Sequence, residues 1–303
     1  MRRRHFLSLL GAISSLAIAR PVSAREPIQR FGPPRFHFGL AAYSLRNYFA
    51  FNKGKAKTQA GDGPKVDMFS FVDYCAQHGF DSAELTSYFF PPNLDDDYLL
   101  RLKRHAFERG VTICGTAIGN NFTVGKGPQL DREVEAAKSW IDRAAVLGAP
   151  HIRFFAGTGA QLAQDPNRMD EACEAIEICA EHAAKKGIYL GIENHGMLSG
   201  DQILEIMERV KSSWVGVNLD TGNFVSEDPY ADLAKCAPLA VNVQVKTQMK
   251  SPSGEEYDAD FDRIAEILKK SNYQGQIVLE YEAGKPYDAI PFALATLRSA
   301  FKV

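Results

Sequence analysis

Four polar residues stand at or near the ends of four short apolar runs in the second half of the chain. Glu193 belongs to IYLGIEN, Asp220 ends WVGVNLD, Gln244 lies in VNVQVK and Glu280 lies in QIVLEYE. Ionised carboxylates in apolar surroundings are costly unless they are paired or bind a metal, and carboxylates that face one another repel strongly. We therefore expect Glu193, Asp220, Gln244 and Glu280 to bind one divalent cation.

The types of these side chains narrow the choice of ion. Three carboxylates and an amide carbonyl are hard oxygen ligands, which suit Mn²⁺ or Mg²⁺ better than Zn²⁺. Four protein ligands leave about two positions of an octahedron for neighbouring oxygens of a polyol or hydroxy-ketone. Each residue alone is more often a hydrogen-bonded core polar group, so their joint placement carries the hypothesis. Glu282 is an alternative to Glu280, because residues two apart share one face of a strand.

The four runs belong to a set of eight candidate strands, each followed by a helical pattern. The strands are expected at residues 37–44, 82–86, 111–118, 151–157, 188–194, 214–220, 241–246 and 276–282. Alternation of strands and helices predicts a parallel sheet with right-handed crossovers. Eight units within about 270 residues predict a single-domain (β/α)8 TIM barrel, in which functional residues gather at the C-terminal ends of the strands. No glycine-rich phosphate loop follows the first strand, which disfavours an open sheet.

Further polar residues fall at the same edge of the predicted barrel. His195 and Lys246 lie just beyond expected metal ligands and could hold substrate hydroxyls or a developing oxyanion. Tyr43 and Glu84 end the first two strands, and Asn121 begins the loop after the third. All five are candidate substrate-binding residues, and for His195 and Lys246 a solvated rim position is the alternative.

Two long loops leave this edge, at residues 47–67 and 119–129. The first is rich in Lys and Gly without an apolar period, which fits either a lid over the active site or an insertion without function. Arg153, inside the fourth strand, is expected to be a core arginine satisfied by a neighbouring acid.

Residues 1–24 have the pattern of a signal peptide. Three arginines precede an apolar run at residues 6–19, and Val22-Ser23-Ala24 suits signal-peptidase cleavage. Arg3-Arg4 followed by Phe6-Leu7 resembles a bacterial twin-arginine signal, with an ordinary secretory signal or a start-site artefact as alternatives. We expect an exported, periplasmic protein whose barrel occupies residues 33–303. The five cysteines, an odd number without a C-x-x-C pair, suit buried thiols and folding in a reducing cytoplasm.

The charge and hydropathy of the chain disfavour nucleic acid and membranes as partners. The formal net charge is -2, which offers no basic surface for nucleic acid. The apolar run near the N-terminus is shorter than the ~20 residues of a membrane-spanning helix. After signal removal we expect no membrane association and no nucleic-acid partner, and the sequence is compatible with either a monomer or a homo-oligomer.

Four segments carry a family resemblance. They are residues 190–196 (LGIENHG), 219–223 (LDTGN), 243–246 (VQVK) and 279–281 (LEY). They resemble the metal-ligand segments of the xylose isomerase-like TIM-barrel superfamily, the sugar phosphate isomerase/epimerase group. The resemblance extends from about residue 36 to the C-terminus. It is closest to an exported branch in which GLAAYS, AELTSY, CGTAIGNNF and LDTGNF recur as similar phrases.

The resemblance implies a mechanism as well as a fold. In sugar 3-epimerases of the group, the residues that match Glu193 and Glu280 bind the metal and exchange a proton with the carbon beside the substrate carbonyl. Such transfer is chemically reasonable, because a metal acidifies that C–H and two carboxylates can remove and return the proton. Those epimerases usually have histidine at the positions of Gln244 and Asn223, and Asn223 is therefore a further candidate for substrate binding.

Several activities remain open at this point. Isomerisation or epimerisation of a keto-sugar is the leading hypothesis. Dehydration of keto-inositols and β-elimination from 3-keto-glycosides are alternatives, because they begin with the same proton abstraction. A barrel that binds sugar without turnover is a second class. A metal-dependent endonuclease is disfavoured, because it needs a histidine-rich zinc cluster and a basic groove.

Overall fold

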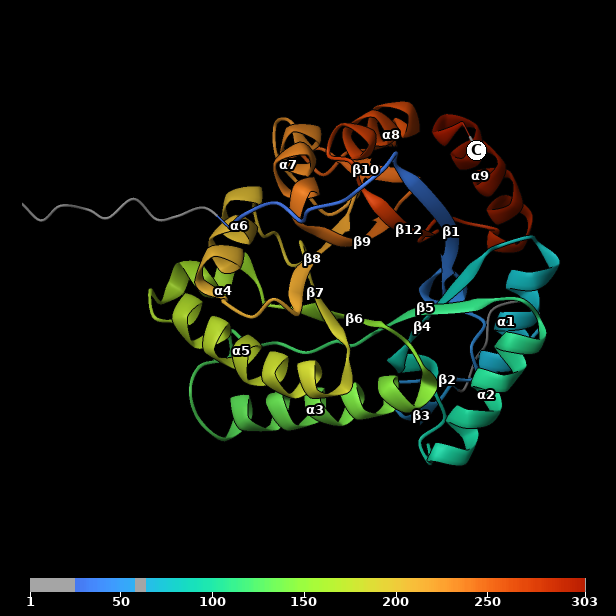
Figure 1. Cartoon of the computed structure of the whole chain (residues 1–303), viewed down its shortest axis with the longest axis horizontal. Helices are drawn as coiled ribbons and strands as arrows, with labels where there is room; N and C mark the ends of the chain where they lie inside the picture. Colours follow the sequence, from blue (N-terminus) through green and yellow to red (C-terminus); the bar gives the residue numbers. More distant parts are fainter. Residues whose placement is uncertain (1–24, 58–63, 303) are drawn as a thin grey trace, which may run out of the picture.

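Eight parallel strands close a barrel in the computed structural model, which describes residues 25–57 and 64–302 (Figure 1). The predicted signal peptide lies outside the described residues. Around the barrel each strand pairs with the next one along the chain, and the last pairs with the first. The strands are β1 (Arg35–Ala41), β4 (Ser82–Thr86), β5 (Thr112–Ala117), β6 (His151–Phe155), β7 (Tyr189–Glu193), β8 (Val215–Asp220), β9 (Ala240–Val245) and β12 (Gln274–Leu279). The predicted TIM barrel is confirmed.

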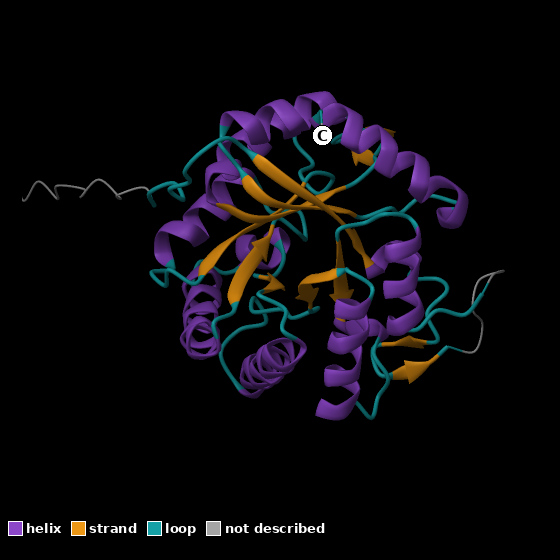
Figure 2. Ribbon diagram, turned by 45° about the vertical axis from the view of Figure 1, so that its right-hand side comes forward, coloured by secondary structure: helices purple, strands orange, loops and turns teal. Residues whose placement is uncertain are grey.

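Helices form the outer layer around the strands (Figure 2). They are α1 (Met68–Gln77), α2 (Asp96–Glu108), α3 (Pro128–Leu147), α4 (Gly159–Gln164), α5 (Arg168–Lys186), α6 (Gly200–Arg209), α7 (Pro229–Cys236), α8 (Phe261–Lys270) and α9 (Pro286–Phe301). Local signals set their ends: Asp67 and Ser199 form capping boxes at the starts of α1 and α6. Gly148 and Gly187 end α3 and α5 at φ of 79° and 69°, a left-handed conformation that glycine adopts without strain.

Short elements modify the loops between barrel units. Residues 42–45, 87–89 and 237–239 form 3₁₀ turns. Two antiparallel hairpins were not expected from the sequence: β2 (Phe51–Asn52) with β3 (Lys55–Ala56), and β10 (Gln248–Lys250) with β11 (Glu256–Asp258). The last barrel strand ends at Leu279, three residues earlier than predicted. Beyond it the chain turns toward the segment after β1, where the Tyr281 N–H donates to Ser44 Oγ at 2.9 Å.

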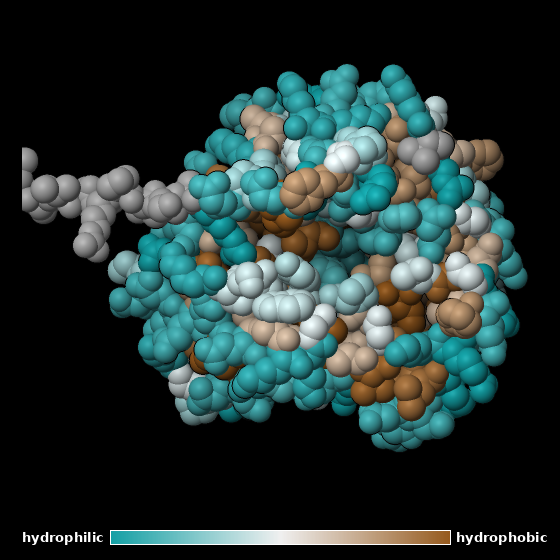
Figure 3. Space-filling model, viewed as in Figure 1, coloured by the Kyte–Doolittle hydropathy of each residue, from teal (hydrophilic) through white to brown (hydrophobic). Residues whose placement is uncertain are grey.

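The apolar core lies between the strands and the helices. Buried side chains from both layers form one large cluster, which includes Leu40, Leu85, Ile141 and Leu294. All five cysteines are buried and free, as predicted. Within residues 25–57 and 64–302, no helix is long and apolar enough to cross a membrane. The view in Figure 3 shows a mostly hydrophilic outer surface with scattered hydrophobic areas.

The interior of the barrel is polar. Glu84 on β4 contacts Gln244 on β9, strands that are not neighbours, so both side chains point inward. Buried polar residues on the barrel strands are Ser82, Glu84, Thr86, Thr116, His151, Arg153, Glu193, Asn218, Asp220, Asn242 and Gln244. Buried polar groups stabilise a fold only when they find partners. The interior therefore has to be arranged by specific hydrogen bonds and ion pairs.

Candidate active site

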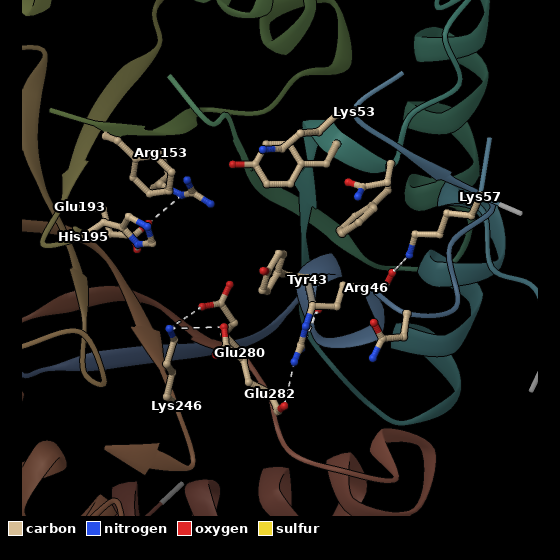
Figure 4. Close-up of a pocket in the computed structure, with 15 residues that line it drawn as sticks. Tyr43, Arg46, Lys53, Lys57, Arg153, Glu193, His195, Lys246, Glu280 and Glu282 are labelled. Atoms are coloured by element: carbon tan, nitrogen blue, oxygen red, sulfur yellow. Dashed lines mark hydrogen bonds and ion pairs between the residues drawn. The ribbon is translucent and has the colours of Figure 1, made fainter. Parts of the chain in front are cut away.

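A cavity of about 420 Å³ opens at the C-terminal ends of the barrel strands (Figure 4). Its lining residues come from β6 and β7 and from the segments that follow β1, β4, β7, β9 and β12. The lining residues are Tyr43, Arg46, Asn47, Asn52, Lys53, Lys57, Tyr88, Phe89, Arg153, Phe155, Glu193, His195, Lys246, Glu280 and Glu282. Polar and charged side chains around a concave site provide the directional contacts that fix a polar ligand.

Glu193, the last residue of β7, is held by three side chains. Arg153 Nε lies 2.8 Å from its Oε2, and Asn223 Nδ2 donates to its Oε1 at 2.8 Å. His195 Nδ1 lies 3.3 Å from the same Oε1, and its ring stacks on Phe155 with centroids 4.0 Å apart. Burial alone would raise the pKa of Glu193, but the Arg153 charge and the His195 contact outweigh it and lower the pKa below its ordinary value. Glu193 is therefore ionised at neutral pH.

Lys246, directly after β9, places its ammonium among three carboxylates. Its Nζ lies 3.5 Å from Asp220 Oδ2, 3.5 Å from Glu280 Oε2 and 3.4 Å from Glu282 Oε1. The same Nζ donates to Asn223 Oδ1 at 3.0 Å. Burial opposes the charge of Lys246, but the surrounding acids outweigh this effect and raise its pKa. The ammonium therefore stays protonated and balances the acids around it.

The carboxyl groups beside Lys246 differ from Glu193. Burial raises the pKa of Glu280 to about 8; Lys246 opposes this shift, while Asp220 and Glu193 add to it. Burial also raises the pKa of Asp220 to about 6. Glu280 is 5% exposed, whereas the Glu282 side chain is 39% exposed at the rim. Of these two alternatives from the sequence, Glu280 is the one buried beside Asp220 and Lys246.

Gln244 belongs to a hydrogen-bonded network below the cavity floor. Its Oε1 accepts from Asn218 Nδ2 at 2.6 Å, and its Nε2 donates to Glu84 Oε1 at 3.0 Å. Asn242 Nδ2 donates to Asn218 Oδ1 at 2.8 Å and lies 3.4 Å from Glu84 Oε2. Burial raises the pKa of Glu84 to about 8. Glu84 is thus a buried interior group rather than a lining residue of the cavity.

The backbone around Asp220 is held in register with β7 and β9. Asn194 Oδ1 accepts from the Asp220 N–H, and Asn194 Nδ2 donates to the Asp220 carbonyl, both at 2.8 Å. Asp220 lies opposite Gln244 in the pairing of β8 with β9. Asp220 Oδ1 accepts from the Gly222 N–H at 2.8 Å, whereas the buried Oδ2 has no hydrogen-bond partner. A buried oxygen of this kind is the feature expected of a cation ligand.

The donors fit a divalent cation in kind. Glu193, Asp220 and Glu280 supply hard carboxylate oxygens from the ends of β7, β8 and β12, and Asp220 Oδ2 accepts no hydrogen bond. In the arrangement described here, however, Arg153 and Lys246 balance these acids and the Gln244 oxygen faces Asn218. Within the described ranges, no group of three His, Cys, Asp or Glu side chains is close enough to hold a metal. The four-ligand metal site stays a prediction, which requires Lys246 to move aside and the Gln244 amide to turn.

The structure brings most of the remaining candidates together. Tyr43 and His195 line the cavity, and Asn223 connects Glu193 with Lys246. Asn121 does not line it: its Nδ2 donates to Gln161 Oε1 at 3.0 Å, and its Oδ1 accepts from Thr123. These bonds join the loop after β5 to α4 and keep the Asn121 amide from the cavity.

Sequence reasoning missed several lining residues. Arg153 does pair with an acid as expected, but it also faces the cavity. Lys53 and Lys57 come from the loop at residues 47–67, which the sequence left as either a lid or an insertion without function, and Arg46 directly precedes it. The high lysine content of that loop is the only feature of the sequence that indicates Lys53 and Lys57 as lining residues. The β2–β3 hairpin brings two of its lysines to the cavity wall and leaves Lys55 off it.

Comparison with known proteins places this fold and site in a family. The sequence model described as xylose isomerase-like TIM barrel matches residues 72–300. The chain belongs to the xylose isomerase-like TIM-barrel family. The match includes β4 to β12 and therefore the strand ends that carry Glu193, Asp220, Gln244 and Glu280. A search of curated proteins found no match.

Solved structures show the same fold at low identity. D-psicose 3-epimerase, crystallised in the presence of D-fructose, has a TM-score of 0.69 at 16% identity, covering 88% of this chain and 100% of that one. The 3-keto-D-glucoside 4-epimerase YcjR from E. coli has a TM-score of 0.62 at 17% identity, covering 88% of this chain and 100% of that one. The IOLI protein with a bound zinc atom has a TM-score of 0.70 at 15% identity, covering 88% of this chain and 98% of that one. A probable 3-DHS dehydratase from Bacillus anthracis is also similar, with a TM-score of 0.65 at 15% identity, covering 86% and 98%.

Proposed function

We propose that this protein is an enzyme that moves a proton at the carbon next to the carbonyl of a sugar, and so isomerises or epimerises it. The observation that carries the proposal is that Glu193 and Glu280 both open into one cavity, from β7 and from the end of β12. A pair of carboxyl groups whose environments push their pKa values in opposite directions is the usual arrangement for an acid and a base. Here the pKa of Glu193 is lowered and that of Glu280 is raised to about 8.

Each residue of the site has a role in this proposal. Ionised Glu193 takes the proton from carbon, and Arg153 and Asn223 hold its carboxylate in place. Protonated Glu280 returns a proton on the other side of the substrate. The Lys246 ammonium, beside Glu280, donates hydrogen bonds to the oxygen on which negative charge develops.

A metal ion belongs to the proposal as a further component. Glu193, Asp220, Gln244 and Glu280 are the residues that would hold Mn²⁺ or Mg²⁺, and such an ion supplies polarisation of the substrate carbonyl. The solved structure of the IOLI protein with zinc supports a metal in a barrel of this fold. The substrate would be a small sugar, with no nucleic acid involved.

Deuterium incorporation tests the proton transfer directly. The protein is incubated with Mn²⁺ and keto-sugars in D₂O, and label next to the carbonyl is followed by NMR. We expect exchange that falls at least ~100-fold in Glu193→Gln and Glu280→Gln, since loss of a general acid or base costs about this much. Glu256→Gln, a change on the outer hairpin, is the matched control. Exchange that persists in both active-site variants would refute the proposal.

A lyase is the alternative for the same residues. Dehydration of a keto-inositol or β-elimination from a 3-keto-glycoside starts with the same proton removal and ends with loss of a leaving group. Similarity to a probable dehydratase supports keeping this alternative. Product analysis separates the two: loss of water or of an alcohol indicates the lyase, and an isomeric sugar indicates the isomerase. Binding without exchange in wild-type protein would indicate a non-catalytic barrel.

A further inference from the structure

Three further cationic side chains line the cavity, and two of them lie at the end away from Glu193 and Lys246. They are Arg46, Lys53 and Lys57, and all come from the segment that follows β1. Figure 4 shows Lys53 and Lys57 across the cavity from Glu193 and Lys246, with Arg46 between the two sides. The cavity therefore has one end rich in acids and another end with only cationic charge among its lining residues.

The contacts of these cations leave their charge uncompensated. Lys57 Nζ donates to the main-chain carbonyl of Arg46, and Lys53 Nζ lies 5.0 Å from the centre of the Tyr88 ring. The Arg46 guanidinium donates to main-chain carbonyls of Tyr43, Tyr281 and Glu282. Among residues 25–57 and 64–302, no carboxylate forms a salt bridge with any of the three. Carbonyl oxygens orient these side chains but carry no net negative charge.

Grouping like charges in this way has a cost. Burial and the nearby Arg46 charge both lower the pKa of Lys57. A neutral sugar would bind through hydroxyl groups and gain little from three cations. A bound anion would relieve the repulsion and make charge-assisted hydrogen bonds with the ammonium groups.

We propose that the substrate is an anionic sugar, with a carboxylate or phosphate group held by Lys53, Lys57 and Arg46 at the end remote from the reacting carbon. The inference rests on the proposed function, because it names the substrate class of the same cavity. Aromatic side chains line the cavity beside the two lysines: Tyr88 lies next to Lys53 and Phe89 next to Lys57, and the Tyr43 ring is 6.2 Å from that of Phe89. They offer flat apolar faces for the C–H side of a sugar.

Three ketohexoses that differ only at C6 form the test. D-fructose is neutral there, D-fructose 6-phosphate carries a phosphate, and D-fructuronate carries a carboxylate. Binding to the Glu280→Gln protein is measured by calorimetry, and deuterium exchange is measured with wild-type protein. We expect at least one anionic probe to bind about tenfold or more tightly than fructose, the factor that corresponds to ~1.4 kcal/mol. The two anionic probes show which group the site prefers.

Variants on the hairpin locate the anion. In Lys53→Met/Lys57→Met protein we expect the preference for the anionic probe over fructose to fall about tenfold or more. Lys55→Met is the matched control, since Lys55 lies on the same hairpin but does not line the cavity. It should keep the preference, and the preference should decline with added salt in wild-type protein.

The outcomes separate this inference from the proposed function. If fructose binds as well as both anionic probes, or if the double variant keeps the anionic preference, the inference is wrong even where exchange occurs. If the anionic preference and its loss in the double variant are seen without exchange of any probe, the anion site stands and the proton transfer fails.

Discussion

Arg153 and Glu193 form an ion pair inside the barrel, with Nε 2.8 Å from Oε2 and side chains only 5% and 4% exposed. A charge in such a position is tolerated only with its partner, because little water can reach it. The pair also fixes the protonation state of Glu193, the residue assigned here as the base. Replacing Arg153 should therefore change both the stability of the fold and the activity.

Arg153→Met should destabilise the protein by about 3–5 kcal/mol, the cost of leaving a buried charge unpaired. Urea unfolding of wild-type and variant protein measures the change. The Arg153→Met/Glu193→Gln double variant removes the stranded charge and should recover much of the stability while staying inactive. A single variant as stable as wild type would show that Arg153 does not balance Glu193.

Lys246→Met should make the metal-free protein less stable and Mn²⁺ binding tighter. Without the ammonium, the buried Asp220 and the rim Glu282 lose the cation that balances them. The variant should melt several degrees lower, since ~1 kcal/mol corresponds to about 2–4 °C in a chain of roughly this size. Calorimetry with Mn²⁺ should show affinity higher by about tenfold, because no internal cation competes. Lys250→Met, which changes an exposed lysine paired with Glu256, is the control. Unchanged Mn²⁺ affinity would contradict the competition.

The contribution of His151 to folding stability should fall as the pH is lowered from about 6.5. His151 is buried between β5 and β7 without a hydrogen-bond partner, and burial lowers its pKa from 6.5 to about 3. The unfolded chain protonates this histidine below pH 6.5 while the folded protein does not, so the His151 contribution declines by up to ~1.4 kcal/mol per pH unit toward pH 3. Unfolding curves between pH 7 and 4 measure this slope.

The His151→Phe variant should lose that contribution to the slope, because its ring cannot be protonated. His37→Phe, a change at an exposed histidine, should retain it. An identical pH dependence in the wild-type and His151→Phe proteins would assign the acid sensitivity to other groups.

We infer that residues 1–24 direct export to the periplasm, and Arg3→Lys/Arg4→Lys tests the route. In a bacterial host, the unaltered precursor should appear in the periplasmic fraction with its N-terminus near residue 25. The double-lysine variant should accumulate in the cytoplasm if the twin-arginine route is used. Continued export of the variant would indicate an ordinary secretory signal.

The barrel could be predicted because its information is local. Apolar runs, helical periods and end signals such as Asp67, Gly148 and Gly187 specify each unit from neighbouring residues. Parallel closure then brings the strand ends that carry Glu193, Asp220 and Glu280 to one edge. The expected placement of acids at that edge followed from the same pattern.

The partners of those acids depended on tertiary structure. Lys246 reaches Asp220 and Glu280 only because their strands lie side by side, and the direction of the Gln244 amide is set by Asn218, 26 residues earlier in the chain. The cationic end of the cavity likewise exists only because the segment after β1 folds back over the barrel mouth. Sequence patterns determined the scaffold and the position of the site. Distances between residues far apart in the chain decided which charges meet, because electrostatic interactions and hydrogen bonds depend on separations of a few ångströms that no local pattern specifies.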